Sequence, residues 1–86
     1  MYKTVIAGYS RSPFTMAKKG ELIDIKPVNL LAEVIKNLVS KSKINPEDIE
    51  DVVVGCAFQV GEQCFNIGKL VTFLSGMNFK TSGMTV

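Results

Sequence analysis

The sequence predicts an α/β fold in which parallel strands alternate with helices in the order β-α-β-α-β. Short runs rich in β-branched residues, at about residues 3–8, 51–57 and 80–86, have the length and composition of strands. Two segments between them, at about 28–42 and 66–75, carry apolar residues at helical spacing. Because helices that connect successive strands of one sheet form right-handed crossovers, we expect the strands to be parallel.

The length and composition indicate one small globular domain over residues 1–86. A chain of 86 residues buries a modest fraction of its surface, so its stability is expected to be marginal. Hydrophobic residue types make up 47% of the chain and charged types 21%, a composition that excludes intrinsic disorder. No apolar run approaches the roughly 20 residues of a membrane span, and no secretory signal is visible. With two cysteines only, we expect a reducing, cytoplasmic location.

The first predicted strand contains the run TVIAG and is expected to be buried. Pro13 prevents this strand from continuing as a central strand. The polar segment 15–26 follows, with Gly20 as a predicted turn, and we expect a long loop there.

The first helix is predicted to begin at Pro27, where the missing N–H of proline costs nothing. Its inner face is formed by a stripe of apolar residues: Leu30, Leu31, Val34, Ile35, Leu38 and Val39. After it, Asn45 and Pro46 predict a short capped turn that leads into the second strand.

The second strand contains VVVGCA, which is apolar on both faces, as expected for a parallel strand that is covered on both sides. The inner face of the second helix is formed by Ile67, Leu70, Val71 and Leu74, and Gly76 fits the left-handed position that ends a helix. The last predicted strand begins at about residue 80.

The two cysteines are the first candidates for chemistry. Cys56 lies at the carboxyl end of a predicted strand, where α/β proteins place ligands. Cys64 lies just ahead of a helix N-terminus, which favours a thiolate. The sequence contains no histidine, which removes every Cys–His pair and Ser–His triad. Each cysteine is therefore expected to pack as a small hydrophobe, with a reactive thiol as the alternative.

The charged candidates are weaker. Arg11 stands beside a rigid Pro-Phe pair and is expected to act as a structural clamp, with a substrate contact as the alternative. Glu62 is the only carboxylate of its loop and is expected to lie at the surface or an interface. Lys18 and Lys19 could meet a phosphate but are expected to be solvated. The net charge is +2 and the basic residues are scattered, so no nucleic-acid partner is expected.

Three stretches in order resemble the N-terminal part of the thiolase family. They are RSPF followed by KKGELIDIKPVNLLAEVI, then GCAFQVGEQCFNIGKLVTFLSGMNF, and finally KTSGMTV. The last resembles the strand that leads into the family's nucleophile motif. The resemblance covers essentially the whole chain and implies the first part of the N-terminal half of the αβαβα thiolase fold.

Thiolases are acyl-CoA C-acyltransferases of lipid metabolism that form or cleave 3-ketoacyl-CoA with a nucleophilic cysteine. The resemblance places that cysteine shortly after Val86, so no catalytic, cofactor-binding or metal residue of the family maps onto this sequence. It also implies that Cys56 and Cys64 are not the nucleophile. No cofactor is expected, since coenzyme A thioesters are substrates of the family.

We therefore expect the N-terminal portion of a thiolase, truncated and inactive by itself. The alternative is a non-catalytic assembly module that self-associates as a dimer or higher oligomer, or pairs with the remainder of a thiolase, through open sheet edges. A weaker alternative is a CoA or nucleotide binder that uses the lysines of the first loop.

Overall fold

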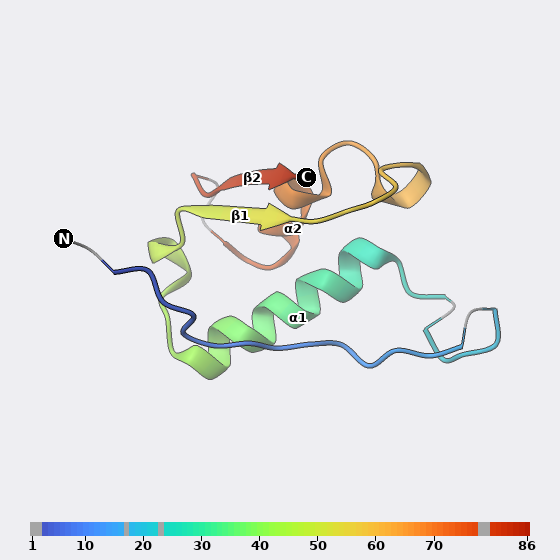
Figure 1. The fold of residues 1–86 in the computed structure, drawn as a ribbon, viewed down its shortest axis with the longest axis horizontal. Helices are drawn as coiled ribbons and strands as arrows, with labels where there is room; N and C mark the ends of the chain where they lie inside the picture. Colours follow the sequence, from blue (N-terminus) through green and yellow to red (C-terminus); the bar gives the residue numbers. More distant parts are fainter. Residues whose placement is uncertain (1–2, 17, 23, 78–79) are drawn as a thin grey trace.

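A computed structural model describes residues 3–16, 18–22, 24–77 and 80–86, which contain a parallel two-stranded sheet and two α-helices (Figure 1). The elements in chain order are α1 (Pro27–Ser42), β1 (Asp51–Val54), α2 (Ile67–Leu74) and β2 (Ser82–Thr85), with 3-10 turns η1 (Pro46–Asp48) and η2 (Gly61–Gln63). The α/β class and the parallel pairing predicted from the sequence are confirmed.

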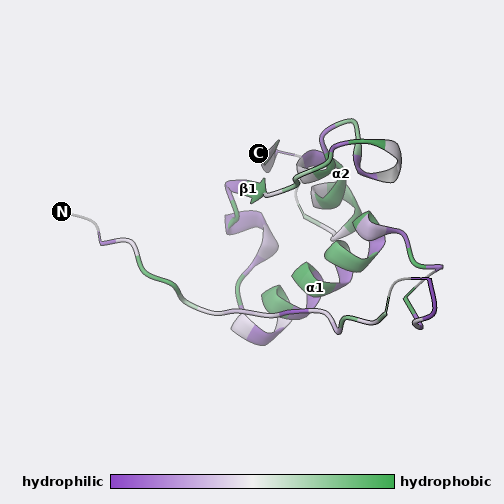
Figure 2. Cartoon of the chain, turned by 45° about the vertical axis from the view of Figure 1, so that its right-hand side comes forward, coloured by the Kyte–Doolittle hydropathy of each residue, from purple (hydrophilic) through white to green (hydrophobic). Residues whose placement is uncertain are grey.

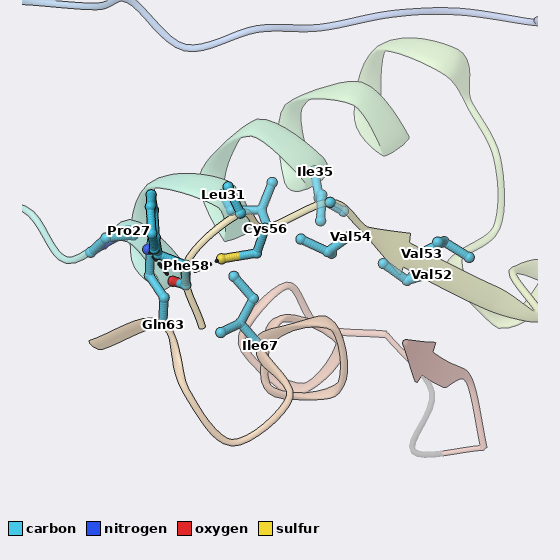
Figure 3. A pocket seen from close by; sticks show the side chains of 12 residues that line it. Pro27, Leu31, Ile35, Val52, Val53, Val54, Cys56, Phe58, Gln63 and Ile67 are labelled. Atoms are coloured by element: carbon cyan, nitrogen blue, oxygen red, sulfur yellow. Dashed lines mark hydrogen bonds between the residues drawn. The ribbon is translucent and has the colours of Figure 1, made fainter. Parts of the chain in front are cut away.

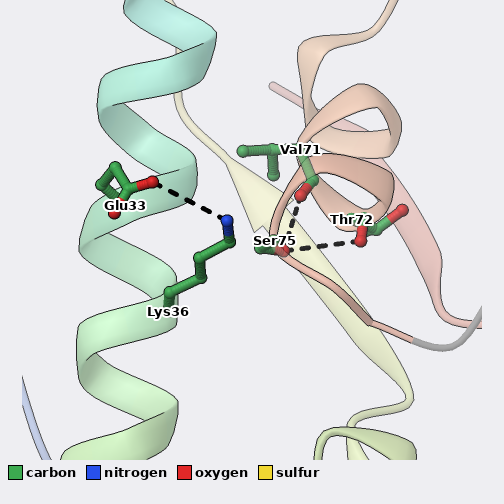
Figure 4. Close-up of polar contacts among 5 residues, drawn as sticks. All are labelled: Glu33, Lys36, Val71, Thr72 and Ser75. Carbon is green, nitrogen blue, oxygen red and sulfur yellow. Dashed lines mark hydrogen bonds and ion pairs between the residues drawn. The ribbon is translucent and has the colours of Figure 1, made fainter.

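Helix α1 starts at Pro27, as the sequence predicts, and its C-cap is Lys43 in the left-handed conformation, with φ 55°. Its apolar stripe faces the rest of the domain (Figure 2), and Ala32 is its one buried residue among those described. A Glu33–Lys36 ion pair at 3.7 Å lies on the side of α1 that borders α2 (Figure 4). Because both partners are exposed, this pair contributes little to stability.

The connection from α1 to β1 follows the predicted capped turn. The Asn45 Oδ1 accepts a hydrogen bond from the Glu47 backbone N–H at 3.1 Å, and Pro46 begins η1. This local cap sets the direction in which the chain enters β1.

Helix α2 supplies most of the core. Ile67 and Val71 are buried with Ala32 of α1, and Thr72 and Thr81 are the buried polar residues. Both threonine hydroxyls donate to backbone carbonyls, Thr72 to Lys69 at 2.7 Å and Thr81 to Ile49 at 2.8 Å. Their burial therefore leaves no unmade hydrogen bond.

The C-terminus of α2 is closed by side-chain and backbone groups together. The Ser75 Oγ donates to the Val71 carbonyl at 2.6 Å and lies 3.4 Å from the Thr72 carbonyl (Figure 4). Gly76 follows with φ 79°, the left-handed conformation predicted from the sequence.

Helix α2 crosses β2 at very short range, through two glycines. A Cβ added to Gly68 would lie 2.5 Å from the Met84 carbonyl oxygen, and one added to Gly83 would lie 2.5 Å from the Lys69 nitrogen. Because no real Cβ comes that close to backbone atoms, only glycine fits at either position without displacing the helix from the strand.

The predicted strand at about residues 3–8 is wrong: the segment forms no strand. It is extended and reaches the C-terminal end of α1, and the residues that follow it run along that helix (Figure 1). Val5 and Ile6 are 74% and 95% exposed. A β-branched run favours a pleated surface, but a strand also needs a hydrogen-bonding partner, and among the described residues β1 pairs with β2 alone.

The residues that follow this segment, Tyr9 and Ser10, contact α1 instead. The Ser10 Oγ donates to Asn37 Oδ1 at 3.0 Å, and the Lys41 ammonium lies 5.1 Å from the centre of the Tyr9 ring. The segment extends the molecule, whose radius of gyration of 13.9 Å exceeds the roughly 12 Å expected for a compact chain of this length.

The remaining elements match their predicted positions with shifted ends. The helices expected at about 28–42 and 66–75 are Pro27–Ser42 and Ile67–Leu74. The strands expected at about 51–57 and 80–86 are the shorter Asp51–Val54 and Ser82–Thr85. The hydrogen bonds between the two strands continue past their carboxyl ends, since the Cys56 N–H donates to the Val86 carbonyl at 2.8 Å.

We predict that Gly68→Ala and Gly83→Ala each lower the free energy of unfolding by about 1–3 kcal/mol, because the added methyl group pushes α2 away from β2. At Gly68 this loss outweighs the roughly 1 kcal/mol that alanine gains in a helix interior. Urea unfolding followed by circular dichroism measures the change.

Gly55→Ala is the matched control, because a Cβ there meets no atom within 4 Å. Its effect should stay within about 0.5 kcal/mol. Equal losses at all three glycines would show that the close helix–strand approach is not the cause.

Candidate functional site

A groove of about 670 Å³ runs along β1 and the loop that follows it, beneath the first half of α1 (Figure 3). Its walls are mainly apolar and include Leu31, Ile35, Val54, Phe58 and Ile67. Its lining continues past the carboxyl end of β1 through Gly55, Cys56 and Phe58, the position at which α/β proteins bind ligands.

Cys56 and Gln63 supply the polar groups of this groove, and they meet at one backbone atom. The Cys56 Sγ lies 3.3 Å and the Gln63 Nε2 3.0 Å from the Phe58 carbonyl oxygen (Figure 3). Both groups act as donors to this one carbonyl, so they hold the loop folded onto itself.

Cys64 ends η2 and is half-buried. Its Sγ donates to the Gly61 carbonyl at 2.9 Å. The residue that precedes the first turn of α2 is Asn66, so Cys64 does not cap that helix. Neither cysteine has a side-chain base among the hydrogen-bond partners that the described residues supply.

The charged candidates lie away from the groove. The Arg11 guanidinium stacks 4.8 Å from the centre of the Phe14 ring, so it binds its own loop as a clamp does. Lys18 and Lys19 are exposed, in a turn that the Gly20 N–H closes on the Met16 carbonyl at 2.8 Å. The side chain of Glu62 lies outside the described part of the structure, and the expectation for it stays a prediction.

A second polar cluster joins the start of α2 to the end of β2. The Thr85 Oγ1 donates to Asn66 Oδ1 at 2.7 Å and accepts from the Gly68 backbone N–H at 3.0 Å. The Asn66 Nδ2 donates to the Gly83 carbonyl at 3.1 Å. Asn66 adopts the left-handed conformation, with φ 55°, which asparagine tolerates better than most residues. We call Asn66 and Thr85 the polar clasp.

Sequence reasoning singled out neither member of the polar clasp as a site residue. Asparagine ahead of a helical stripe is a signal for a helix start, and Asn66 does stand there. Its partner lies 19 residues away on another element, a pairing that no local pattern in the sequence specifies.

The described residues provide no group of three or more Cys, Asp or Glu side chains that could hold a metal ion. Among the same residues, no helix is long and apolar enough to cross a membrane.

Parallel strands joined by a helix that packs on them define an α/β protein, and here the polar clasp ties that helix to the end of the second strand. The sequence model of the domain described as "Thiolase, N-terminal domain" matches residues 4–86. The chain belongs to the thiolase family, and the part of that family that it matches lies in the N-terminal domain.

Curated relatives agree with this assignment. Over the whole length of this chain, it is 38% identical to a 3-ketoacyl-CoA thiolase of Colwellia psychrerythraea and 34% identical to one of Shewanella frigidimarina. A 3-ketoacyl-CoA thiolase of Psychrobacter arcticus is 33% identical over 95% of the chain. The chain spans only 21–22% of the length of these relatives.

We predict that Thr85→Val destabilises the domain by about 1–3 kcal/mol, because it leaves the part-buried Gly68 N–H and the Asn66 amide without their partner. Thr85→Ser keeps the hydroxyl and should cost less. Chemical denaturation of the two variants beside the parent measures the difference. If serine costs as much as valine, then the lost methyl group, and not the polar clasp, determines the effect.

Proposed function

We propose that this chain is the N-terminal portion of an acyl-CoA C-acyltransferase that forms or cleaves 3-ketoacyl-CoA in lipid metabolism, in the cytoplasm. The observation that carries the proposal is the domain match over residues 4–86. Relatives named 3-ketoacyl-CoA thiolase, at 33–38% identity over nearly all of the chain, support the same reaction class.

Within such an enzyme the described residues act as scaffold and not as the nucleophile. Acyl transfer to a cysteine needs a thiolate that a neighbouring base or positive charge activates. Here both thiols donate to backbone carbonyls, Cys56 to Phe58 and Cys64 to Gly61, and the 86 residues contain no histidine. The coenzyme A thioester is then a substrate that other residues of the enzyme activate.

We predict that the 86-residue chain alone has no thiolase activity above the rate without protein, because neither cysteine is activated. Purified chain is mixed with a 3-ketoacyl-CoA and free CoA, and loss of the ketoacyl thioester is followed by absorbance.

Cys56→Ser and Cys64→Ser variants are assayed in parallel. Turnover that disappears in one variant only would identify that cysteine as a nucleophile and contradict the scaffold role. Turnover that survives in both variants would require a route that uses neither thiol.

The second candidate is an assembly module that associates with itself or with other thiolase chains. The specific observation in its favour is the small sheet: in the described residues it has two strands, so each strand has one edge without a neighbouring strand. Large apolar side chains such as Val53, Phe58 and Val60 are 59–75% exposed around it. Open strand edges beside exposed apolar groups favour association.

For this candidate we predict dimers or larger oligomers at tens of micromolar protein, because pairing satisfies edge backbone groups and buries apolar surface. Sedimentation velocity over a dilution series measures the distribution. A single monomer boundary across the whole series would contradict the assembly role, while leaving the thiolase assignment untouched.

A further inference from the structure

We propose that Cys56 and Cys64 form a reversible disulfide across the loop that joins β1 to α2, with a small disulfide such as oxidised glutathione as the oxidant. This redox switch goes beyond the proposed function, because it uses the two free thiols for which the scaffold role has no use. The crosslink ties the end of β1 to the start of α2.

The two cysteines lie at opposite ends of one short loop. Cys56 follows closely on β1, which ends at Val54, and Cys64 comes directly after η2 and shortly before α2 begins at Ile67. Both cysteines are half-buried, whereas residues 57–61 between them are exposed. Within the described residues, η2 is the one regular element of this loop. The loop therefore has few packing contacts that would resist a change of shape.

Hydrogen bonds bend this loop so that its two ends approach each other. The Cys56 Sγ and the Gln63 Nε2 lie 3.3 Å and 3.0 Å from the same atom, the Phe58 carbonyl oxygen (Figure 3). Gln63 is the immediate neighbour of Cys64 in the chain. The side chain next to one cysteine therefore reaches the atom that binds the other cysteine, which brings both thiols to the same part of the loop.

Little holds the two thiols in their reduced positions. Each donates to a backbone carbonyl, Cys56 to Phe58 and Cys64 to Gly61 at 2.9 Å, and a thiol is a weak donor. Gly61 has φ 59°, and a Cβ built there meets no atom within 4 Å. Because glycine has no side chain and this one has open space around it, the backbone at Gly61 can rotate and turn Cys64 toward Cys56.

The reaction consists of two successive thiol–disulfide exchanges. The thiolate of one cysteine attacks a sulfur of oxidised glutathione, which forms a mixed disulfide and releases one glutathione thiolate. The thiolate of the other cysteine then attacks the mixed disulfide, so that the bond between Cys56 and Cys64 forms and the second glutathione leaves. The protein loses two protons and two electrons, and oxidised glutathione takes them up as two thiols.

The crosslink acts on the groove beside β1. Cys56, Phe58 and Gln63 all line that groove, and oxidation takes the Cys56 Sγ away from the Phe58 carbonyl. The wall that these residues form is then held by a covalent bond and not by a sulfur hydrogen bond. In a reducing compartment a disulfide of this kind is transient, so its formation reports oxidation.

The test equilibrates the 86-residue chain with reduced and oxidised glutathione, quenches with acid, alkylates free thiols and measures the products by mass spectrometry. The intraloop disulfide releases two glutathione molecules for each oxidised glutathione consumed. Diluting the glutathione pair tenfold at a constant ratio should therefore raise the disulfide-to-dithiol ratio about tenfold. Cys56→Ser and Cys64→Ser can form only a mixed disulfide with glutathione, and its fraction should stay constant on dilution. Mixed disulfides at both cysteines of the parent chain, or a disulfide between two chains, would overturn the proposal.

A matched pair of variants tests whether the bend of the loop brings the thiols together. Gln63→Leu should lower the disulfide-to-dithiol ratio about threefold or more, because it removes a hydrogen bond that folds the loop back. Gln59→Leu makes the same change at an exposed residue of the same loop and should leave the ratio unchanged. Equal effects of the two variants, or a parent ratio that does not fall when the chain is unfolded in concentrated urea, would overturn the proposal.

Discussion

The contact on which the rest of the fold depends is the close approach of α2 to β2 at Gly68 and Gly83. Two backbones come together there with no side chain between them. This short distance brings Asn66 within reach of the Gly83 carbonyl and Thr85 within reach of the first turn of the helix. It also lets Val71 and Thr72 become fully buried in a chain that has little core to offer. The close packing of α2 on β2 therefore buries side chains that so small a domain would otherwise leave exposed.

The helices could be predicted from the sequence because their signals are local. Pro27 at the start of α1, the apolar stripe that follows and Gly76 after α2 each act within a few residues of their own position. The strand predicted at residues 3–8 was wrong for the opposite reason. Their β-branched residues favour a pleated surface, but whether a neighbouring strand is available to pair with them depends on the whole fold. The chain that follows is held to α1 through Tyr9 and Ser10, and residues 3–8 pair with neither strand of the sheet.

The same distinction applies to the site. Cys56 could be placed at the end of a strand from the sequence, and the structure puts it in the groove there. What the sequence could not give is the direction of the thiol, which depends on where the loop brings the carbonyl of Phe58 and the amide of Gln63. The polar clasp could not be predicted from the sequence, because Asn66 and Thr85 are 19 residues apart and belong to different elements. The resemblance to thiolases, by contrast, depends on ordered motifs along the chain, and the family match over residues 4–86 confirms it.

The parallel register of the sheet has a consequence for how the domain folds. Asp51 pairs with Ser82, 31 residues further along the chain, so the first ladder bond must close a long loop before any strand contact forms. Helix α1 has only local hydrogen bonds and can form in microseconds or less. The sheet should therefore be the last element to form and the first to open, and the slow step of folding is the docking of α2 as it brings β2 to β1. Newly made chains would spend that interval with β1 wholly unpaired, which is when wrong strand pairings between molecules compete most strongly with folding.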